Sequence, residues 1–153
     1  MSGNDHQHSV DVDVPVNVAY NQWTQFATFP EFMDGVEAIT QEGDDKLHWT
    51  IDIAGVKREF DTTITEQTPD QRIAWTTTEG PSHAGVVTFH KLTDQQARVT
   101  LQMDYEPAGF LENVGDKLGF VSSRLKGDMK NFKQVIESRH TPTGAWRGTI
   151  EQN

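Results

Sequence analysis

The feature that most limits how this chain can fold is a long amphipathic helix, predicted over Phe110 to Ser138. Its apolar residues recur every three or four positions and form one stripe, made of Leu111, Val114, Leu118, Val121, Leu125, Met129, Phe132 and Ile136. At about 1.5 Å per residue the helix would be on the order of 40 Å long, which is more than the width of a small domain. A broad apolar surface must therefore receive the stripe.

Small residues form a second strip in the first half of this helix, at Gly115, Gly119 and Ser122. Each glycine in a helix interior costs about 1 kcal/mol relative to alanine. Two interpretations stay open. The small residues permit close packing of the backbone against a neighbour, or they leave space for a ligand.

The rest of the chain is predicted to be mostly strands. Apolar and polar residues alternate from Val10 to Val14 and again in a meander of about six strands between residues 36 and 105. Between these, Asn17 to Phe26 has helical spacing, and Phe29 to Met33 forms a brief aromatic turn broken by Pro30. Short turns connect the strands, so the sheet is predicted to be antiparallel, with one apolar face covered by the long helix.

The length and composition indicate one domain. The chain has 153 residues, of which 9–139 are assigned to the domain, while 1–8 and 140–153 are predicted to be flexible tails. A formal net charge of -10 disfavours binding to nucleic acid. No apolar run approaches the roughly 20 residues that span a bilayer, and no signal peptide is visible. These features predict a soluble, cytoplasmic protein without stable membrane insertion.

At this level of detail the sequence resembles the SRPBCC or START-like superfamily, in the group of polyketide cyclase/dehydrases and coenzyme Q-binding, lipid-transport-like proteins. The resemblance is carried by the segments VDVPVNVAYNQWTQFATFPEFM, LHWTIDIAGVKREFDTTITEQTPDQRIAW, GVVTFHKL, VTLQMDYEP, FKQVIESR and TGAWRG. It implies an α+β helix-grip fold, in which a curved antiparallel β-sheet wraps around a long C-terminal α-helix, with two short helices after the first strand. It also implies a cavity between sheet and helix for an apolar or amphipathic small molecule, such as a lipid, a quinone or a polyketide-like compound. We expect no cofactor and no metal.

The strand alternation and the helix stripe predict which residues would line such a cavity. They are Phe29, Phe32, Met33, Trp49, Ile51, Arg58, Phe60, Thr62, Trp75, Thr77, His83, Val87, Met103, Tyr105, Leu111, Val114, Gly115 and Leu118. A mostly apolar set with a few polar groups is typical of a ligand site. The mouth is predicted between Phe29–Met33, the Gly80–His83 corner and Gly109–Gly115.

Two alternatives to simple binding remain open. A polyketide cyclase or dehydratase needs a general base and a donor to an enolate oxygen, and Arg58, His83 and Tyr105 are the inward candidates. His48 and His90 alternate outward, and motifs of nucleophilic or metal-dependent hydrolases are absent from the sequence. The other alternative is an interaction module without a cavity.

Overall fold

The computed structural model describes residues 5–53, 55–80, 82–105 and 117–151, without the side chains of residues 5, 6, 105, 117 and 118. The elements follow one another as β1 (Asp5–Val12), α1 (Val16–Trp23), the short 3-10 helix η1 (Phe26–Glu31), β2 (Val36–Gln41), β3 (Lys46–Ile53), β4 (Val56–Thr68), β5 (Arg72–Glu79), β6 (His83–Thr93), β7 (Gln96–Tyr105), α3 (Lys117–Arg139) and β8 (Ile150–Glu151).

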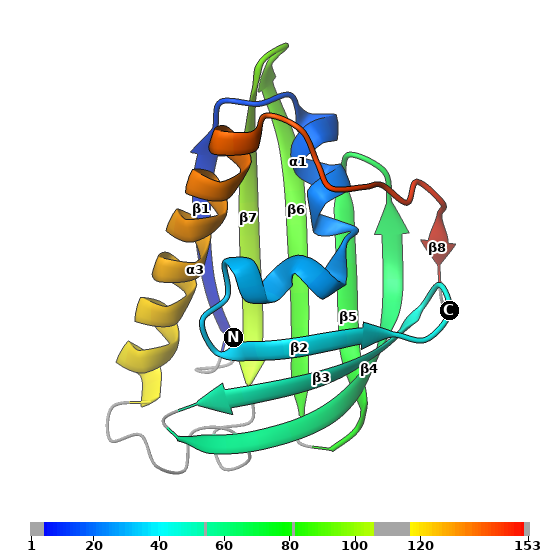
Figure 1. Ribbon diagram of the computed structural model, residues 1–153, viewed down its shortest axis with the longest axis vertical. Helices are drawn as coiled ribbons and strands as arrows, with labels where there is room; N and C mark the ends of the chain where they lie inside the picture. Colours follow the sequence, from blue (N-terminus) through cyan, green and yellow to red (C-terminus); the bar gives the residue numbers. More distant parts are fainter. Residues whose placement is uncertain (1–4, 54, 81, 106–116, 152–153) are drawn as a thin grey trace.

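The strands form one antiparallel sheet in the order β1-β7-β6-β5-β4-β3-β2, and β8 pairs with β4 beside this path. The sheet curls so strongly that β2 and β3 run across the direction of β6 and β7 (Figure 1). Helix α3 lies next to β1, and α1 and η1 lie over the same face of the sheet (Figure 1). This is the helix-grip arrangement that the sequence predicted.

The apolar stripe of α3 faces the core. Val121, Leu125, Met129, Phe132 and Ile136 are each at most 4% exposed. The helix ends at Arg139, one residue beyond the predicted end, and residues 110–116 of the prediction lie outside the described residues. The spacing of the apolar residues therefore located the buried face correctly over the described part of the helix.

The two ends of the chain contact the domain. Strand β1 begins at Asp5, and residues 5–8 pair with β7. These residues are polar, but the pairing uses backbone groups and needs no apolar side chain. At the other end, residues 140–149 pass over α1, and Ile150 pairs with Gln67 of β4 (Figure 1). The predicted flexibility of residues 1–8 and 140–153 is a statement about their motion rather than their position, and it stays a prediction.

Strand alternation is interrupted where β4 meets β5. Val56 to Ile64 alternate as predicted, with Phe60, Thr62 and Ile64 buried. A register shift between Ile64 and Glu66 then turns the next inward position to Gln67, which is 1% exposed. A period of two cannot predict this change of face.

Close packing of Trp75 depends on a glycine in the neighbouring strand. Gly85 pairs with Trp75 across β5 and β6, and the indole ring covers the space where a side chain would stand. A Cβ atom at this position would lie 2.3 Å from Trp75 Cζ2, far inside van der Waals contact. Trp75 therefore keeps its position only while residue 85 has no side chain.

We expect Gly85→Ala to lower the free energy of unfolding by about 1–3 kcal/mol, the usual cost of overpacking. Urea unfolding followed by tryptophan fluorescence would measure it. Gly127→Ala is the control, because a Cβ there has no neighbour within 4 Å and alanine favours a helix by about 1 kcal/mol. An unchanged midpoint for Gly85→Ala would contradict the packing described here.

Candidate functional site

Three aromatic rings from neighbouring strands form the base of the candidate site. Trp49 on β3 is stacked on Phe60 of β4, its cross-strand partner, with ring centroids 5.4 Å apart and planes 16° apart. Trp75 on β5 lies 5.8 Å from Trp49. All three are at most 3% exposed, so the strands place a continuous aromatic surface on the inner face of the sheet.

Four further rings come from α1, η1 and the residue that follows η1, and we call them the aromatic plug: Trp23, Phe26, Phe29 and Phe32. Phe29 lies 5.1 Å from Trp23, 6.1 Å from Trp49 and 6.5 Å from Trp75, so the plug rests on the aromatic base. Trp23 and Phe32 lie 5.2 Å and 5.3 Å from Phe132 of α3. The plug therefore joins the sheet to the long helix.

His83 is the titratable group at the centre of this cluster. It begins β6, is 1% exposed, and its ring lies 4.9 Å from Phe60, 5.2 Å from Trp49 and 6.4 Å from Trp75. Burial lowers its pKa to about 3, because the low-polarity surroundings disfavour the imidazolium. The ring is therefore neutral near pH 7, with one nitrogen able to donate and the other able to accept a hydrogen bond.

Two of the predicted hydroxyl groups are used inside the protein. Thr62 is 1% exposed, and its Oγ1 accepts a hydrogen bond from Trp49 Nε1 at 2.9 Å. Thr77 Oγ1 lies 2.6 Å from both the backbone N–H and the backbone carbonyl of His83. These two hydroxyls thus fix Trp49 and the start of β6.

The remaining predicted residues divide into three groups. Met33, Ile51, Val87 and Met103 belong to the same buried core as the aromatic cluster. Arg58 is half-buried, and its Nη1 donates to the carbonyl of Lys57 at 3.0 Å. Leu111, Val114 and Gly115 lie outside the described residues, as do the side chains of Tyr105 and Leu118. The backbone of Tyr105 pairs with His83.

The outward position predicted for His48 is confirmed. Its side chain is 34% exposed, with Nδ1 2.6 Å from Asp61 and Nε2 2.9 Å from Glu59. Hydrogen bonds to Glu59 and Asp61 raise the pKa of His48. This histidine with two carboxylate partners is therefore on the face of the sheet opposite the aromatic cluster.

Asp128 is a buried carboxyl group that the sequence analysis missed. It is 6% exposed, accepts a hydrogen bond from the backbone N–H of Asp34 at 3.3 Å, and has its pKa raised to about 7 by burial. A cleft of about 360 Å³ lies beside it, lined by Asp34, Phe120, Ser123, Arg124, Gly127 and Asp128. Asp128 is three residues after Leu125 and four before Phe132, so its position on the stripe could have shown that it is buried.

Metal binding has no evident location in the described residues. Within 5–53, 55–80, 82–105 and 117–151, no three His, Asp or Glu side chains gather closely enough to hold a metal ion. The helices in these ranges include none long and apolar enough to cross a membrane.

Comparison with known proteins places the chain in a family. Residues 12–134 match the family described as polyketide cyclase / dehydrase and lipid transport. The chain belongs to this family. A relative from Streptomyces lincolnensis, described as a 17.2 kDa protein of the melC2-rnhH intergenic region, is 55% identical over 145 residues, which are 94% of this chain and 97% of the relative.

Solved structures share the fold of this family member. The Zhui aromatase/cyclase from Streptomyces sp. R1128 matches with a TM-score of 0.70 and 16% identity, over 93% of this chain and 98% of that one. A START superfamily protein from Mycobacterium smegmatis matches with a TM-score of 0.66 and 13% identity, over 88% and 95% of the two chains. The resemblance inferred from the sequence is confirmed at the level of family and fold.

The raised pKa of Asp128 predicts a pH-dependent stability. Below the ordinary pKa of 3.8 the carboxyl is protonated in both the folded and unfolded states. Between 3.8 and about 7 only the folded state holds the proton, so the free energy of unfolding falls as pH rises through this window and stays low above it. Asp128→Asn should remove this contribution, since an amide can accept the Asp34 hydrogen bond without ionising.

We therefore expect Asp128→Asn to be more stable than the wild type at pH 8, by a few kcal/mol at most, and close to it at pH 4. Urea denaturation at both pH values measures the difference, and Asp94→Asn serves as the control, because the Asp94 side chain is 87% exposed and does not line this cleft. A constant difference between Asp128→Asn and the wild type at the two pH values would contradict the prediction.

Proposed function

We propose that this protein binds a hydrophobic or amphipathic small molecule between the curved sheet and the C-terminal helix. The observation that carries the proposal is the buried aromatic cluster around His83. Ligand sites are mostly apolar, with a few polar groups that fix orientation. Trp49, Phe60 and Trp75 supply flat apolar surface, and the neutral His83 ring supplies a donor and an acceptor.

The ligand would take space that the aromatic plug fills in this structure. Phe29 rests on Trp49 and Trp75, so a displacement of Phe29 uncovers the aromatic base and the edge of the cluster that holds His83. Tyr105, Leu111, Val114, Gly115 and Leu118 remain proposed contributors from the sequence pattern. Lipids, quinones and polyketide-like molecules all offer apolar surface with a few oxygens, which suits this combination.

A cyclase or dehydratase is the second candidate, because the family description includes both activities. An efficient general base has a pKa near the working pH. The pKa of about 3 makes His83 a weak base, and the carboxylate-paired His48 is on the opposite face of the sheet. Binding without chemistry therefore has the stronger support from the described residues.

Native mass spectrometry of the purified protein tests the proposal directly. We expect a bound lipid, quinone or polyketide-like molecule that is released on unfolding. After its removal, the amphipathic fluorescent probe anilinonaphthalene sulfonate should bind and quench the fluorescence of the buried tryptophans. Folded protein that carries no molecule and takes up no probe would overturn the proposal and favour an interaction module.

A pair of matched variants locates the site. Phe29→Leu and Phe89→Leu each replace a ring that is at most 4% exposed, but Phe89 packs on Tyr20 rather than on the aromatic base. We expect both variants to lose a similar amount of stability, whereas only Phe29→Leu should change the probe affinity by several-fold. Equal changes in probe affinity would place the binding site elsewhere.

A further inference from the structure

The segment that follows α3 contacts the elements that carry the aromatic plug. Helix α3 ends at Arg139, and the next residue, His140, turns the chain with a positive φ of 59°, while its N–H donates to the Ile136 carbonyl at 2.8 Å. The chain then passes over α1 and reaches β4 through β8 (Figure 1). We call residues 140–151 the C-terminal strap.

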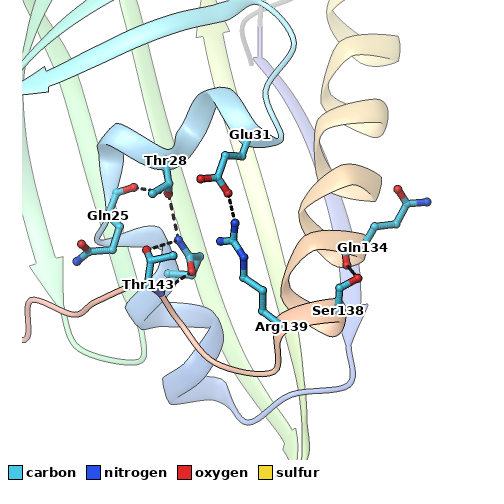
Figure 2. Close-up of polar contacts among 8 residues, drawn as sticks. Gln25, Thr28, Glu31, Gln134, Ser138, Arg139 and Thr143 are labelled. Carbon is cyan, nitrogen blue, oxygen red and sulfur yellow. Dashed lines mark hydrogen bonds and ion pairs between the residues drawn. The ribbon is translucent and has the colours of Figure 1, made fainter.

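Gln22 is the first of three anchoring points for the strap. It is 1% exposed, although it lies on α1 and carries a polar amide. Its Nε2 donates to Thr143 Oγ1 and to Thr28 Oγ1, each at 3.0 Å, and its Oε1 accepts from the Thr143 N–H at 3.0 Å. Figure 2 shows Thr143 reaching from the strap toward Thr28 of η1. One buried amide therefore ties the strap to α1 and η1 together.

The second anchoring point joins the strap to the turn between α1 and η1. Thr24 is 3% exposed, and its Oγ1 accepts a hydrogen bond from the Trp146 N–H at 3.1 Å. Gly144 lies so close to Gln25 that a Cβ atom would stand 2.7 Å from the Gln25 Oε1. The backbone of the strap thus lies directly on this turn.

Arg147 forms the third anchoring point. Its Nη1 donates to Asn21 Oδ1 at 2.6 Å, its Nη2 donates to Asp70 Oδ2 at 2.8 Å, and its guanidinium lies 5.4 Å from the centre of the Tyr20 ring. Just before the strap, Arg139 also pairs with Glu31 at the end of η1, at 2.5 Å (Figure 2). Apart from the pairing of β8 with β4, the contacts of Thr143, Trp146, Arg147 and Arg139 end on α1, η1, the turn between them, or the β4–β5 turn.

Ile150 packs against the core and β8 pairs with β4, but the side-chain contacts of the strap with α1, η1 and the β4–β5 turn are polar contacts that water can replace. The side chains of Arg147 and Asp70 are 41% and 33% exposed, and exposed ion pairs of this kind add little to stability. When the strap leaves, water can reach the amide of Gln22, so no buried polar group is stranded. Segments of this kind open at low free-energy cost, as functional gates require.

From these contacts we propose that the C-terminal strap is a latch that holds α1 and η1 over the sheet and controls entry of the ligand. This inference rests on the proposed function for its binding part only. Releasing the strap frees the elements that carry Trp23, Phe26 and Phe29, and movement of these rings uncovers the aromatic base. The strap thereby regulates a site that it does not touch.

The test uses the full-length chain with Thr143→Pro and Arg147→Ala combined. Proline has neither the N–H nor the hydroxyl that Gln22 binds, and alanine removes the guanidinium. Arg98→Ala is the matched control, since Arg98 forms an exposed pair with Asp11 at 2.7 Å between β1 and β7, away from the strap. Arg147→Ala alone provides a milder variant that keeps the Thr143 contacts.

Hydrogen exchange is read at the amides of Thr24, Gln25 and Thr28, which donate to Asn21, Gln22 and Gln25. We expect at least a tenfold faster exchange there in the double variant, a smaller increase in Arg147→Ala, and wild-type rates in Arg98→Ala and throughout β6. The association rate of anilinonaphthalene sulfonate should rise by a similar factor.

Each other outcome has a defined meaning. Unchanged exchange at these amides, or an equal increase in β6, overturns the latch. Faster exchange with an unchanged association rate overturns its control of entry. If neither the wild type nor the variant takes up the probe, the proposed function fails, and faster exchange at the three amides still supports the strap as a latch on α1 and η1.

Discussion

The packing of Phe29 between the sheet and the helices is the interaction on which the rest of the structure depends. Its ring contacts Trp49 and Trp75 on one side and Trp23 on the other, and Trp23 in turn contacts Phe132 of α3. Aromatic pairs of this kind contribute about 0.5–1.5 kcal/mol beyond the area they bury. A strongly curled sheet and a helix beside its first strand leave space between them, and these rings fill it.

This filling bears on the proposed ligand binding. The rings that occupy the interior come from α1 and η1, which are short, rather than from α3 or the sheet. A short element held mainly by side-chain packing and by the polar contacts of residues 140–151 can move without loss of the sheet pairing. The proposed binding relies on such a movement, because it would open a space between the sheet and α3.

Buried polar groups lie at the junctions between elements. Gln22 joins α1, η1 and the C-terminal strap, Asp128 joins α3 to the turn before β2, and His83 begins β6 beside the aromatic base. Burial lowers the pKa of His83, and it raises that of Asp128 in spite of the opposing charge of Arg124, so that the neutral form is favoured in both cases. The interior therefore disfavours charged side chains at these two positions.

Much of the fold was determined by the sequence alone, because strand and helix periodicity are local properties. The alternation in β3, β4 and β7 and the stripe of α3 identified the inner faces, and the order of the motifs indicated the family. The tertiary structure decided the rest. Gln67 turns inward through a register shift, Asp128 is buried because a backbone turn covers it, and the strap docks through scattered polar contacts. Such contacts join residues far apart in the chain and leave no periodic pattern, and pKa values depend on burial that only the assembled fold creates.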